Sequence, residues 1–455
     1  MKESGYNYFV QDKDKVICMN GISGNVFAAT NDVYNAIKDI LHSPNKLSND
    51  PEIVDYLYKL HFLIDDNMNE IEILKKRYND ALKSKSYHLI INPTLECNFR
   101  CWYCYESHNK GHMDIKTIER VKKFIDKTMR REDITHFHLS WFGGEPLLYF
   151  DEVMYPIAIY AQQKAIEYEK TFEHSMTSNG FRLTQEVIKK CVETELSSIQ
   201  VTLDGNREHH NKTRNHNGTP SYDIILNNII NYCKVSKSNK IILRINYTNE
   251  VIKNDMQAVF TSIPEIIRPQ IEVSFHRVWQ TIGIEKSTID VQNKIEALQT
   301  MKFATVQNAI YARYKGYVCY ADSLNYININ FDGSIYKCTA NDYKKENRLG
   351  YVDKEGNLVL EKQQLLEQIN NMANFENPLC LKCKRLAICG GFCFNRKMKF
   401  ITKNEYKCLK SKMDADLDSF VRRYYNKRIE NRQSIICPKT DKAIRNRAHL
   451  KNINH

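Results

Sequence analysis

The chain has 455 residues, 42% of them hydrophobic and 26% charged, and its formal net charge is +12. This length predicts two or three domains at roughly 150 residues each, and the composition is that of a globular protein. No apolar run approaches the ~20 residues that cross a membrane, and the N-terminus lacks the apolar core of a signal peptide. We therefore expect a cytoplasmic protein with no membrane partner. Acidic residues are interleaved with the basic ones almost everywhere, which predicts a solvated surface and no nucleic-acid partner.

Residues 1–84 predict a small sheet followed by helices. Short β-like runs are separated by turns rich in Gly, Ser, Asp and Lys, and they cover Tyr8–Val10, Val16–Asn20 and Asn25–Ala29. Thr30 or Asn31 is placed to cap a first helix that reaches Leu41. Asp50 followed by Pro51 is typical of the start of a second helix.

Residues 85–313 alternate strand-like runs with helical patterns. The strand-like runs lie at 87–96, 136–145, 173–180, 197–205, 240–248 and 271–279, and helical patterns lie between them, for example at 115–130, 151–169 and 221–235. Strict alternation predicts parallel strands joined by crossover helices. Six such units predict an α/β fold with a partial (β/α)6 TIM-like barrel. Ligands bind such sheets at the carboxyl ends of the strands, where Gly-rich and polar residues stand here.

The 14 cysteines are the main chemical signal. In a reducing compartment, clustered cysteines bind metal more often than they form disulfides. Ten of them fall into two groups, and the first group is Cys97, Cys101 and Cys104, directly after the first barrel strand. Three thiolates can hold three irons of one cubane cluster and leave the fourth iron open, whereas zinc normally takes four closed ligands. The four remaining cysteines are expected to be small buried apolar residues, and they are Cys18, Cys191, Cys233 and Cys437.

The spacing C-x3-C-x-aromatic-C, with Tyr103 as the aromatic residue, resembles the signature of the radical-SAM superfamily. This resemblance implies a 4Fe-4S cluster whose open iron chelates S-adenosylmethionine. One electron, from a flavodoxin- or ferredoxin-type donor, would then yield a 5′-deoxyadenosyl radical that takes hydrogen from the substrate. The cofactor would carry out this chemistry, and the protein would orient the reacting groups and exclude water.

Further motifs stand where this family has them. A GGEP sequence ends the second strand, SNG ends the third and DG ends the fourth. Each alone would be a turn, but their order behind the cysteines strengthens the resemblance. Arg214 and Arg244 could meet the carboxylate of S-adenosylmethionine or could be surface or strand-end arginines, and His276 and Arg277 are candidate substrate contacts. The implied contacts to S-adenosylmethionine are Tyr103, Gly143, Gly144, Glu145, Ser178, Asn179, Asp204, Arg214 and Arg244.

The second cysteine group lies in residues 314–410 and contains seven thiols, enough for nearly two cubane clusters. Its C-x2-C pair alone would favour a zinc ribbon. The whole pattern instead resembles the SPASM domain, which implies two auxiliary clusters and three 4Fe-4S clusters in all. By this resemblance the first auxiliary cluster is held by Cys319, Cys338 and Cys393, and the second by Cys380, Cys383, Cys389 and Cys408. Residues 411–455 are expected to form a C-terminal helix and a basic tail.

The N-terminal region resembles the winged-helix domain that recognises leader peptides, although a generic N-terminal extension is an alternative. Together the parts resemble radical SAM/SPASM maturases of ribosomally synthesised, post-translationally modified peptides, of the sactipeptide or ranthipeptide type. The resemblance implies a precursor peptide bound through its leader and an intramolecular cross-link, with a thioether favoured over a carbon–carbon bond. The sequence names no catalytic base.

Two other functions are weighed against this one. A sulfatase-maturating enzyme, which makes formylglycine, would have an acidic residue directly after Cys338, but Thr339 stands there. A zinc-ribbon protein that binds nucleic acid through its basic surface belongs to another class. Bound iron and a brown colour would separate the enzyme from this last alternative, which would be colourless and hold zinc.

Overall fold

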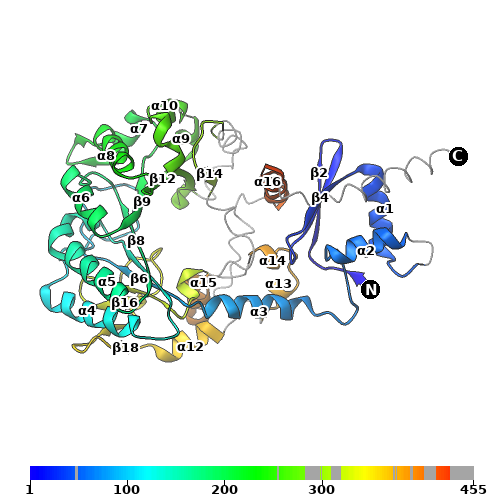
Figure 1. Ribbon diagram of the computed structural model, residues 1–455, viewed down its shortest axis with the longest axis horizontal. Helices are drawn as coiled ribbons and strands as arrows, with labels where there is room; N and C mark the ends of the chain where they lie inside the picture. Colours follow the sequence, from blue (N-terminus) through cyan, green and yellow to red (C-terminus); the bar gives the residue numbers. More distant parts are fainter. Residues whose placement is uncertain are drawn as a thin grey trace.

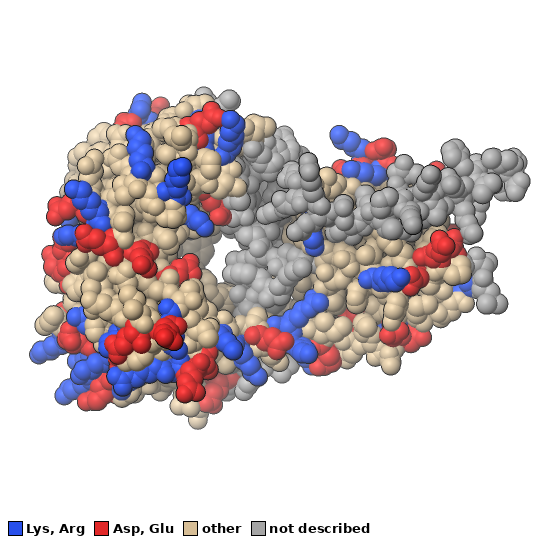
Figure 2. Space-filling view, viewed as in Figure 1, with Lys and Arg blue, Asp and Glu red and all other residues tan. Residues whose placement is uncertain are grey.

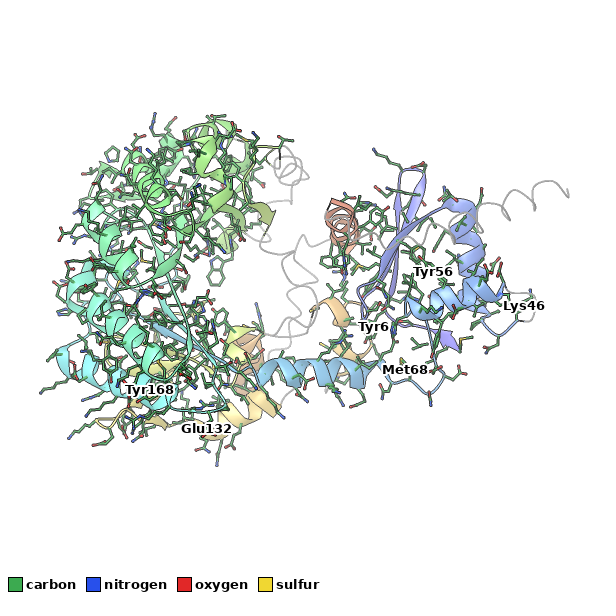
Figure 3. The ribbon with its side chains drawn as sticks, in the orientation of Figure 1. Tyr6, Lys46, Tyr56, Met68, Glu132 and Tyr168 are labelled. Atoms are coloured by element: carbon green, nitrogen blue, oxygen red, sulfur yellow. The ribbon has the colours of Figure 1, made fainter. Side chains whose placement is uncertain are left out.

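The structure is a computed structural model, which describes residues 1–46, 50–253, 256–281, 298, 300–308, 319–371, 375, 377–389, 393–403 and 417–430. Figure 1 shows a small N-terminal sheet with its helices set apart from the barrel, and a helix that runs between the two. This helix is α3 (Glu70–Leu82), and its Asn69 side chain caps it by accepting from two backbone N–H groups. Figure 3 places Tyr6 and Met68 where α3 leaves the N-terminal domain and Glu132 on the side of the barrel.

The N-terminal domain is a three-stranded antiparallel sheet of β2 (Asn7–Asp12), β3 (Lys15–Asn20) and β4 (Val26–Thr30), with β3 in the centre. These strands confirm the three predicted runs. Because side chains alternate along a strand, the central strand buries its two faces against different partners: Cys18 faces α1 (Asn31–His42) and α2 (Pro51–Lys59), whereas Ile17 and Met19 face α16 (Leu417–Glu430). The sheet is therefore sandwiched between helices from the two ends of the described chain. A short pair, β1 (Lys2–Glu3) with β5 (Leu63–Ile64), closes the domain.

The barrel sheet is parallel and follows chain order. Its strands are β6 (Ser86–Ile91), β7 (His136–Trp141), β8 (Thr171–Ser178), β9 (Leu196–Thr202), β12 (Lys240–Tyr247), β13 (Ile271–Arg277) and β14 (Thr305–Asn308). The first six confirm the predicted units and the α/β class, and β14 is a strand that the sequence analysis did not predict. The helices around it are α4 (Ile115–Met129), α5 (Tyr155–Glu167), α6 (Gln185–Glu193), α7 (Arg207–Thr213), α8 (Tyr222–Val235), α9 (Asn249–Lys253) and α10 (Met256–Thr261).

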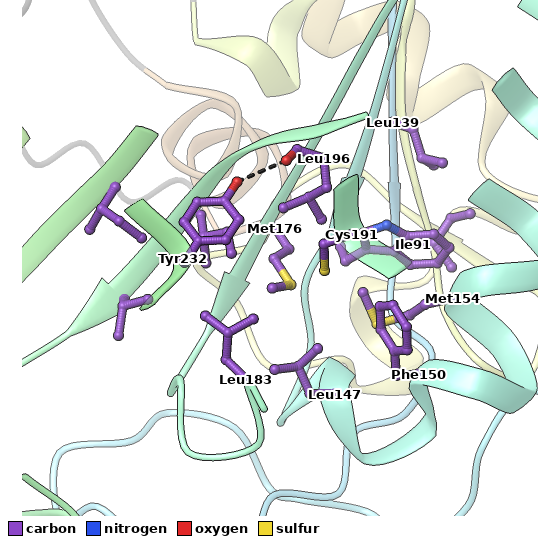
Figure 4. Close-up of a cluster of buried hydrophobic side chains, with 14 of the residues drawn as sticks. Ile91, Leu139, Leu147, Phe150, Met154, Met176, Leu183, Cys191, Leu196 and Tyr232 are labelled. Atoms are coloured by element: carbon purple, nitrogen blue, oxygen red, sulfur yellow. Dashed lines mark hydrogen bonds between the residues drawn. The ribbon is translucent and has the colours of Figure 1, made fainter. Parts of the chain in front are cut away.

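The main core lies between this sheet and its helices (Figure 4). Leu139 of β7 and Met176 of β8 face outward into it, and the Tyr232 hydroxyl of α8 donates to the Leu196 carbonyl at 2.8 Å. Each fully buried aliphatic side chain contributes about 1.5–3 kcal/mol. Cys191 lies in the same core. The prediction of buried apolar cysteines is confirmed for Cys18, Cys191 and Cys233, while Cys437 lies outside the described residues.

The sheet continues beyond the barrel. Strand β15 (Tyr326–Ile329) pairs in parallel with β6, and an antiparallel meander of β16 (Ser334–Tyr336), β17 (Gly350–Val352) and β18 (Leu358–Leu360) follows. The sequence analysis did not predict this continuation, because strands of three or four residues carry little periodicity. Four helices complete the region: α12 (Gln363–Asn371), α13 (Pro378–Leu381), α14 (Leu386–Cys389) and α15 (Phe394–Lys403).

Smaller elements connect these parts. They are the pair β10 (Asn215–His216) and β11 (Thr219–Pro220), η1 (Pro146–Tyr149), the π-helical turn η2 (Phe150–Met154), η3 (Glu265–Gln270), η4 (Trp279–Thr281), η6 (Tyr320–Asp322) and η7 (Lys345–Asn347). Figure 2 shows basic and acidic side chains interspersed on the visible face of the barrel, as predicted for a solvated surface. Within the described residues, no helix is both long and apolar enough to cross a membrane.

Candidate active site

The first cysteine group forms a loop at the carboxyl end of β6. Cys97 and Cys101 are partly buried and Cys104 is exposed. Burial raises the pKa of Cys97 to about 12 and that of Cys104 to about 11, and the neighbouring Cys101 adds to both. The Phe99 amide donates to the Cys97 sulfur at 3.4 Å. The three thiols are thus close enough to affect one another, and bound metal would be needed to keep them ionised at neutral pH.

The two glycines after β7 let that strand end pack directly on the cysteine loop. A Cβ on Gly144 would lie 2.2 Å from the Glu96 carbonyl oxygen and 2.4 Å from that of Leu95, so no side chain fits there. Gly143 has a φ of +103°, which disfavours other residues. The Glu145 amide then donates to the Glu96 carbonyl at 2.8 Å. The close backbone approach predicted for these glycines is thus an approach to the cysteine loop.

Glu145 is fully buried and ties two strand ends together. Its carboxylate accepts from the Ser178 hydroxyl at 2.8 Å, the Asn179 amide at 2.7 Å and the Leu147 amide at 3.0 Å. Burial raises the pKa of Glu145, and these hydrogen bonds oppose the rise. The Asn179 side chain in turn donates to Asn98 in the cysteine loop at 2.7 Å. Both carboxylate oxygens already serve as acceptors, so Glu145 holds the ends of β7 and β8 in register beside the cysteines.

Tyr103 is the centre of a second polar network. Its hydroxyl donates to Asp204 and accepts from Arg214 at 2.7 Å and from Asn246 at 3.2 Å. Arg214 is only 8% exposed, which excludes a surface role for it, and its guanidinium lies 3.8 Å from Asp204. Arg244 donates to Asn246 at 2.8 Å from the middle of β12. The structure thus brings every predicted cofactor contact to the edge of the barrel that carries the cysteines.

Three buried polar atoms around the loop have no hydrogen-bond partner among the described residues: Asn98 Nδ2, Asp204 Oδ1 and Arg214 Nε. Buried polar groups in folded proteins are nearly always paired, so unpaired donors and acceptors at one place indicate a polar ligand. S-adenosylmethionine carries ammonium, carboxylate and hydroxyl groups that match this set. The residues present therefore fit the predicted cofactor.

Sequence reasoning missed several residues of this region because they lie just outside the motifs. Burial raises the pKa of Glu106 to about 8, and the Asp342 carboxylate adds to the rise. Next to it, the Tyr105 hydroxyl donates to the Thr339 carbonyl. The segment after Cys104 therefore contacts the segment after Cys338, so the two cysteine groups adjoin. In the sequence, this contact was indicated only by the aromatic and acidic pair Tyr105 and Glu106 directly after Cys104.

Three cysteines of the second group also come together. They are delivered by three elements: Cys319 before η6, Cys338 after β16 and Cys393 before α15. Burial raises the pKa of Cys319 to about 11 and that of Cys338 to about 12, and the other thiols of the trio add to both. The amides of Ala321 and Phe394 donate to the Cys319 sulfur. This trio is the set that the SPASM resemblance assigned to one cluster.

The remaining cysteines of this group are described only in part. Cys380 and Cys383 stand at either end of one turn, with the Cys383 amide donating to the Cys380 carbonyl at 3.0 Å, and Cys389 ends α14. Cys408 lies outside the described residues. No group of three or more His, Cys, Asp or Glu side chains in the described chain converges on a single metal ion. Cubane thiolates each bind a different iron and need no such convergence.

Histidines line the barrel interior below the cysteine loop. His88 of β6 stacks on His138 of β7 with ring centroids 4.2 Å apart, and both rings bond to the Ser140 hydroxyl at 2.9 and 3.0 Å. Burial, followed by the neighbouring His138, lowers the pKa of His88 to about 3. Tyr320, next to Cys319, lies edge-on to His88 at 6.4 Å. His276, a predicted substrate contact, pairs with the Ser274 hydroxyl at 3.0 Å on β13.

Comparison with known proteins agrees with this geometry. Residues 91–259 match the Radical SAM superfamily. The chain is similar to the Fe-coproporphyrin III synthase of Methanosarcina barkeri (28% identity over 44% of this chain and 46% of that protein) and to the GTP 3′,8-cyclase of Photorhabdus laumondii (30% identity over 28% of this chain and 37% of that protein). It spans less than half the length of these curated relatives.

Solved structures share the fold over more of the chain. The structure of anSMEcpe with bound AdoMet aligns with a TM-score of 0.52 at 18% identity, over 79% of this chain and 99% of that one. Streptococcus suis SuiB bound to precursor peptide SuiA aligns with a TM-score of 0.50 at 15% identity, over 88% of this chain and 97% of that one. Enzymes of the matched superfamily use a 4Fe-4S cluster and S-adenosylmethionine. Residues 91–259 are therefore a radical SAM domain.

Proposed function

We propose that this protein is a peptide maturase that abstracts hydrogen from a precursor peptide and closes an intramolecular cross-link, with a thioether favoured over a carbon–carbon bond. The observation that carries the proposal is the cysteine loop beside the unpaired Asn98, Asp204 and Arg214 atoms, with a second, partly buried cysteine trio next to it. The fold likeness to SuiB, solved with a precursor peptide, supports a peptide as substrate.

In this proposal Cys97, Cys101 and Cys104 hold a 4Fe-4S cluster, and S-adenosylmethionine binds beside it. The bound pair supplies a carbon radical that takes hydrogen from the substrate. Arg214, with its unpaired Nε, is placed for a carboxylate, and Asp204 Oδ1 is placed to accept from an ammonium or hydroxyl group. The remaining predicted contacts orient these groups: Tyr103, Gly143, Gly144, Glu145, Ser178, Asn179 and Arg244. A flavodoxin- or ferredoxin-type protein would donate the electron.

The second group would hold two further clusters in residues 314–410. One would take Cys319, Cys338 and Cys393, and the other Cys380, Cys383, Cys389 and Cys408. Only three protein thiolates serve the first of these, and thiolate is the preferred ligand of an iron that lacks one. A cysteine of the substrate could bind there, which favours a thioether product.

Residues 1–84 would bind the leader of the precursor peptide. Within the described residues, β2 and β4 each pair with only one other strand of their sheet, so each offers an edge for an added strand. The other proposed domains are the barrel at 85–313, the cluster domain at 314–410 and a helix with a basic tail at 411–455. Hydrogen exchange tests the leader site: adding a Cys-containing precursor peptide with its leader should protect residues 7–12 or 26–30. Unchanged exchange in both strands would contradict it.

A second candidate is formylglycine formation, because the fold also resembles anSMEcpe. The position after Cys338 argues against it. Thr339 stands there, its hydroxyl pairs with that of Tyr320 and its carbonyl accepts from Tyr105. None of these groups is a carboxylate that could act as a base.

The deciding experiment is anaerobic incubation of the reconstituted protein with S-adenosylmethionine, a reductant and that Cys-containing peptide. We expect a product that loses two hydrogen atoms and one titratable thiol. A product that keeps every thiol would favour the carbon–carbon bond, and a peptide aldehyde would favour formylglycine formation. An unmodified peptide, with S-adenosylmethionine still cleaved, would contradict the choice of substrate.

A further inference from the structure

Each element that delivers a cysteine of the partly buried trio Cys319, Cys338 and Cys393 also delivers one charged side chain next to it. Asp322 follows Cys319 in η6, Lys337 precedes Cys338, and Lys397 follows Cys393 in α15. All three are buried, with exposures of 3%, 7% and 1%. Full-length lysine side chains are almost never this buried without a partner.

The partners of the two lysines differ. Lys397 lies 3.2 Å from Asp322, and the Tyr78 hydroxyl accepts from Lys397 and donates to Asp322. Lys337 donates to the Ser323 carbonyl at 2.6 Å and lies over the Tyr326 ring, but no carboxylate within the described residues reaches it as an ion-pair partner. Two ammonium groups and one carboxylate leave one buried positive charge that the described side chains do not neutralise.

Asp322 is the first negative group that acts on Lys337, but Lys397 already pairs with it, and the thiol trio is the next source of negative charge. Lys337 interacts electrostatically with Cys319, and Asp322 with both Cys319 and Cys338. Neutral thiols would leave the Lys337 ammonium uncompensated in a low-dielectric site, which is strongly unfavourable. Thiolates that ligate iron give the site a net negative charge and supply the missing counter-ion.

We propose that Lys337 and the Lys397–Asp322 pair set the reduction potential of the cluster held by Cys319, Cys338 and Cys393, and that their net positive charge raises it. The inference rests on the proposed function, since it takes the trio to hold a cluster. A reduced cluster carries one more negative charge than an oxidised one, so a fixed cation beside it favours the reduced form. A raised potential suits an electron acceptor, and closing a thioether after hydrogen abstraction requires one electron to leave the substrate.

The test uses the full-length chain with Cys97, Cys101 and Cys104 replaced by Ala, so that only auxiliary clusters remain. Their potentials are measured by electron paramagnetic resonance during an anaerobic redox titration. Lys337→Met should lower the ratio of reduced to oxidised cluster at a fixed potential about tenfold, a shift of about 59 mV for one electron. Asp322→Asn should shift the same couple in the opposite direction. Lys337→Arg and the exposed control Lys354→Met should leave it in place.

The test depends on the reduction potentials of Lys337→Met and Asp322→Asn shifting in opposite directions, because a general loosening of the site would shift both potentials in the same direction. Shifts of one sign, or none in either variant, would overturn the proposal while leaving the clusters themselves intact. If Lys337→Met fails to bind iron, Asp322→Asn still tests the sign, because the proposal requires it to raise the potential while Lys337→Arg leaves the potential unchanged. If the variant with Cys97, Cys101 and Cys104 replaced by Ala bound no iron at all, the auxiliary clusters on which the inference rests would be absent.

Discussion

The two cysteine groups adjoin but are built differently. The first is one continuous loop after β6, and unpaired polar atoms of Asn98, Asp204 and Arg214 surround it. The trio of the second group is assembled from three separate elements, and its neighbours are backbone amides, apolar side chains and the buried charges of Asp322, Lys337 and Lys397. An open polar rim suits a site where a ligand binds and leaves. A site with buried, fixed charges of net positive sign suits a negatively charged group that stays bound.

The sharpest way to break this comparison is to remove each group in turn. Replacing Cys97, Cys101 and Cys104 by Ala should lower reductive cleavage of S-adenosylmethionine roughly a thousandfold or more, because the open iron is lost. Replacing Cys380 and Cys383 by Ala should leave cleavage without peptide within about threefold. Chromatographic assay of 5′-deoxyadenosine measures both. Equal losses in the two variants would show that the groups do not have separate roles.

The glycine contact beneath the first loop gives the next largest effect. Gly144→Ala would place a Cβ 2.2 Å from the Glu96 carbonyl, so the cysteine loop must move. We expect a loss of roughly 2–4 kcal/mol in the free energy of unfolding, together with weaker iron binding. Gly5→Ala is the matched control, because its Cβ would meet nothing closer than 3.4 Å. Equal stability of both variants in urea would refute the tight contact.

The hydroxyl of Tyr103 offers a smaller and more specific perturbation. Tyr103→Phe leaves Asp204 without its donor and removes an acceptor from Arg214. A buried polar group that loses its partner costs about 1–3 kcal/mol, so affinity for S-adenosylmethionine should fall about 5- to 100-fold. Calorimetry on the reconstituted protein measures it, with the exposed hydroxyl of Tyr155 removed as a control. Unchanged affinity would mean that the network is only structural.

His88, on the strand between the two groups, gives the smallest effect. Its pKa is lowered to about 3, so the unfolded chain binds more protons than the folded one between about pH 3 and 6.5. The contribution of His88 to stability is therefore lost as the pH falls through that window. In His88→Asn, the drop in unfolding free energy from pH 7 to pH 5 should shrink by on the order of 1–2 kcal/mol. Urea titrations at both pH values test this, and parallel curves for the two proteins would contradict it.

Much of the first group could be predicted from sequence because it is local. Cys97, Cys101 and Cys104 lie within one stretch of eight residues that follows β6, and parallel strands bring their carboxyl ends to one edge. Glu145 and Asp204 stand at strand ends on that edge, and the family resemblance singled them out. The hydrogen-bond partners of Glu145 could not be predicted from the sequence, because they depend on the exact register of β7 and β8.

The second group was less predictable because its contacts are long-range. The cysteine count suggested clusters, and the family resemblance supplied the grouping of Cys319, Cys338 and Cys393. The buried charges Asp322, Lys337 and Lys397 carried no sequence signal, since a lysine or aspartate beside a cysteine is usually solvated. The pairing of β15 with β6 was also missed, because a four-residue strand has too few positions to show a period.

Metal content tests the central claim most directly. The account predicts that anaerobically reconstituted protein is brown and holds about 12 irons with matching sulfide, and that the Cys97, Cys101 and Cys104 triple Ala variant keeps about eight. About four irons in the wild type would remove the auxiliary clusters and leave only the first group. Colourless protein with zinc on these cysteines, and no iron after reconstitution, would contradict the account altogether.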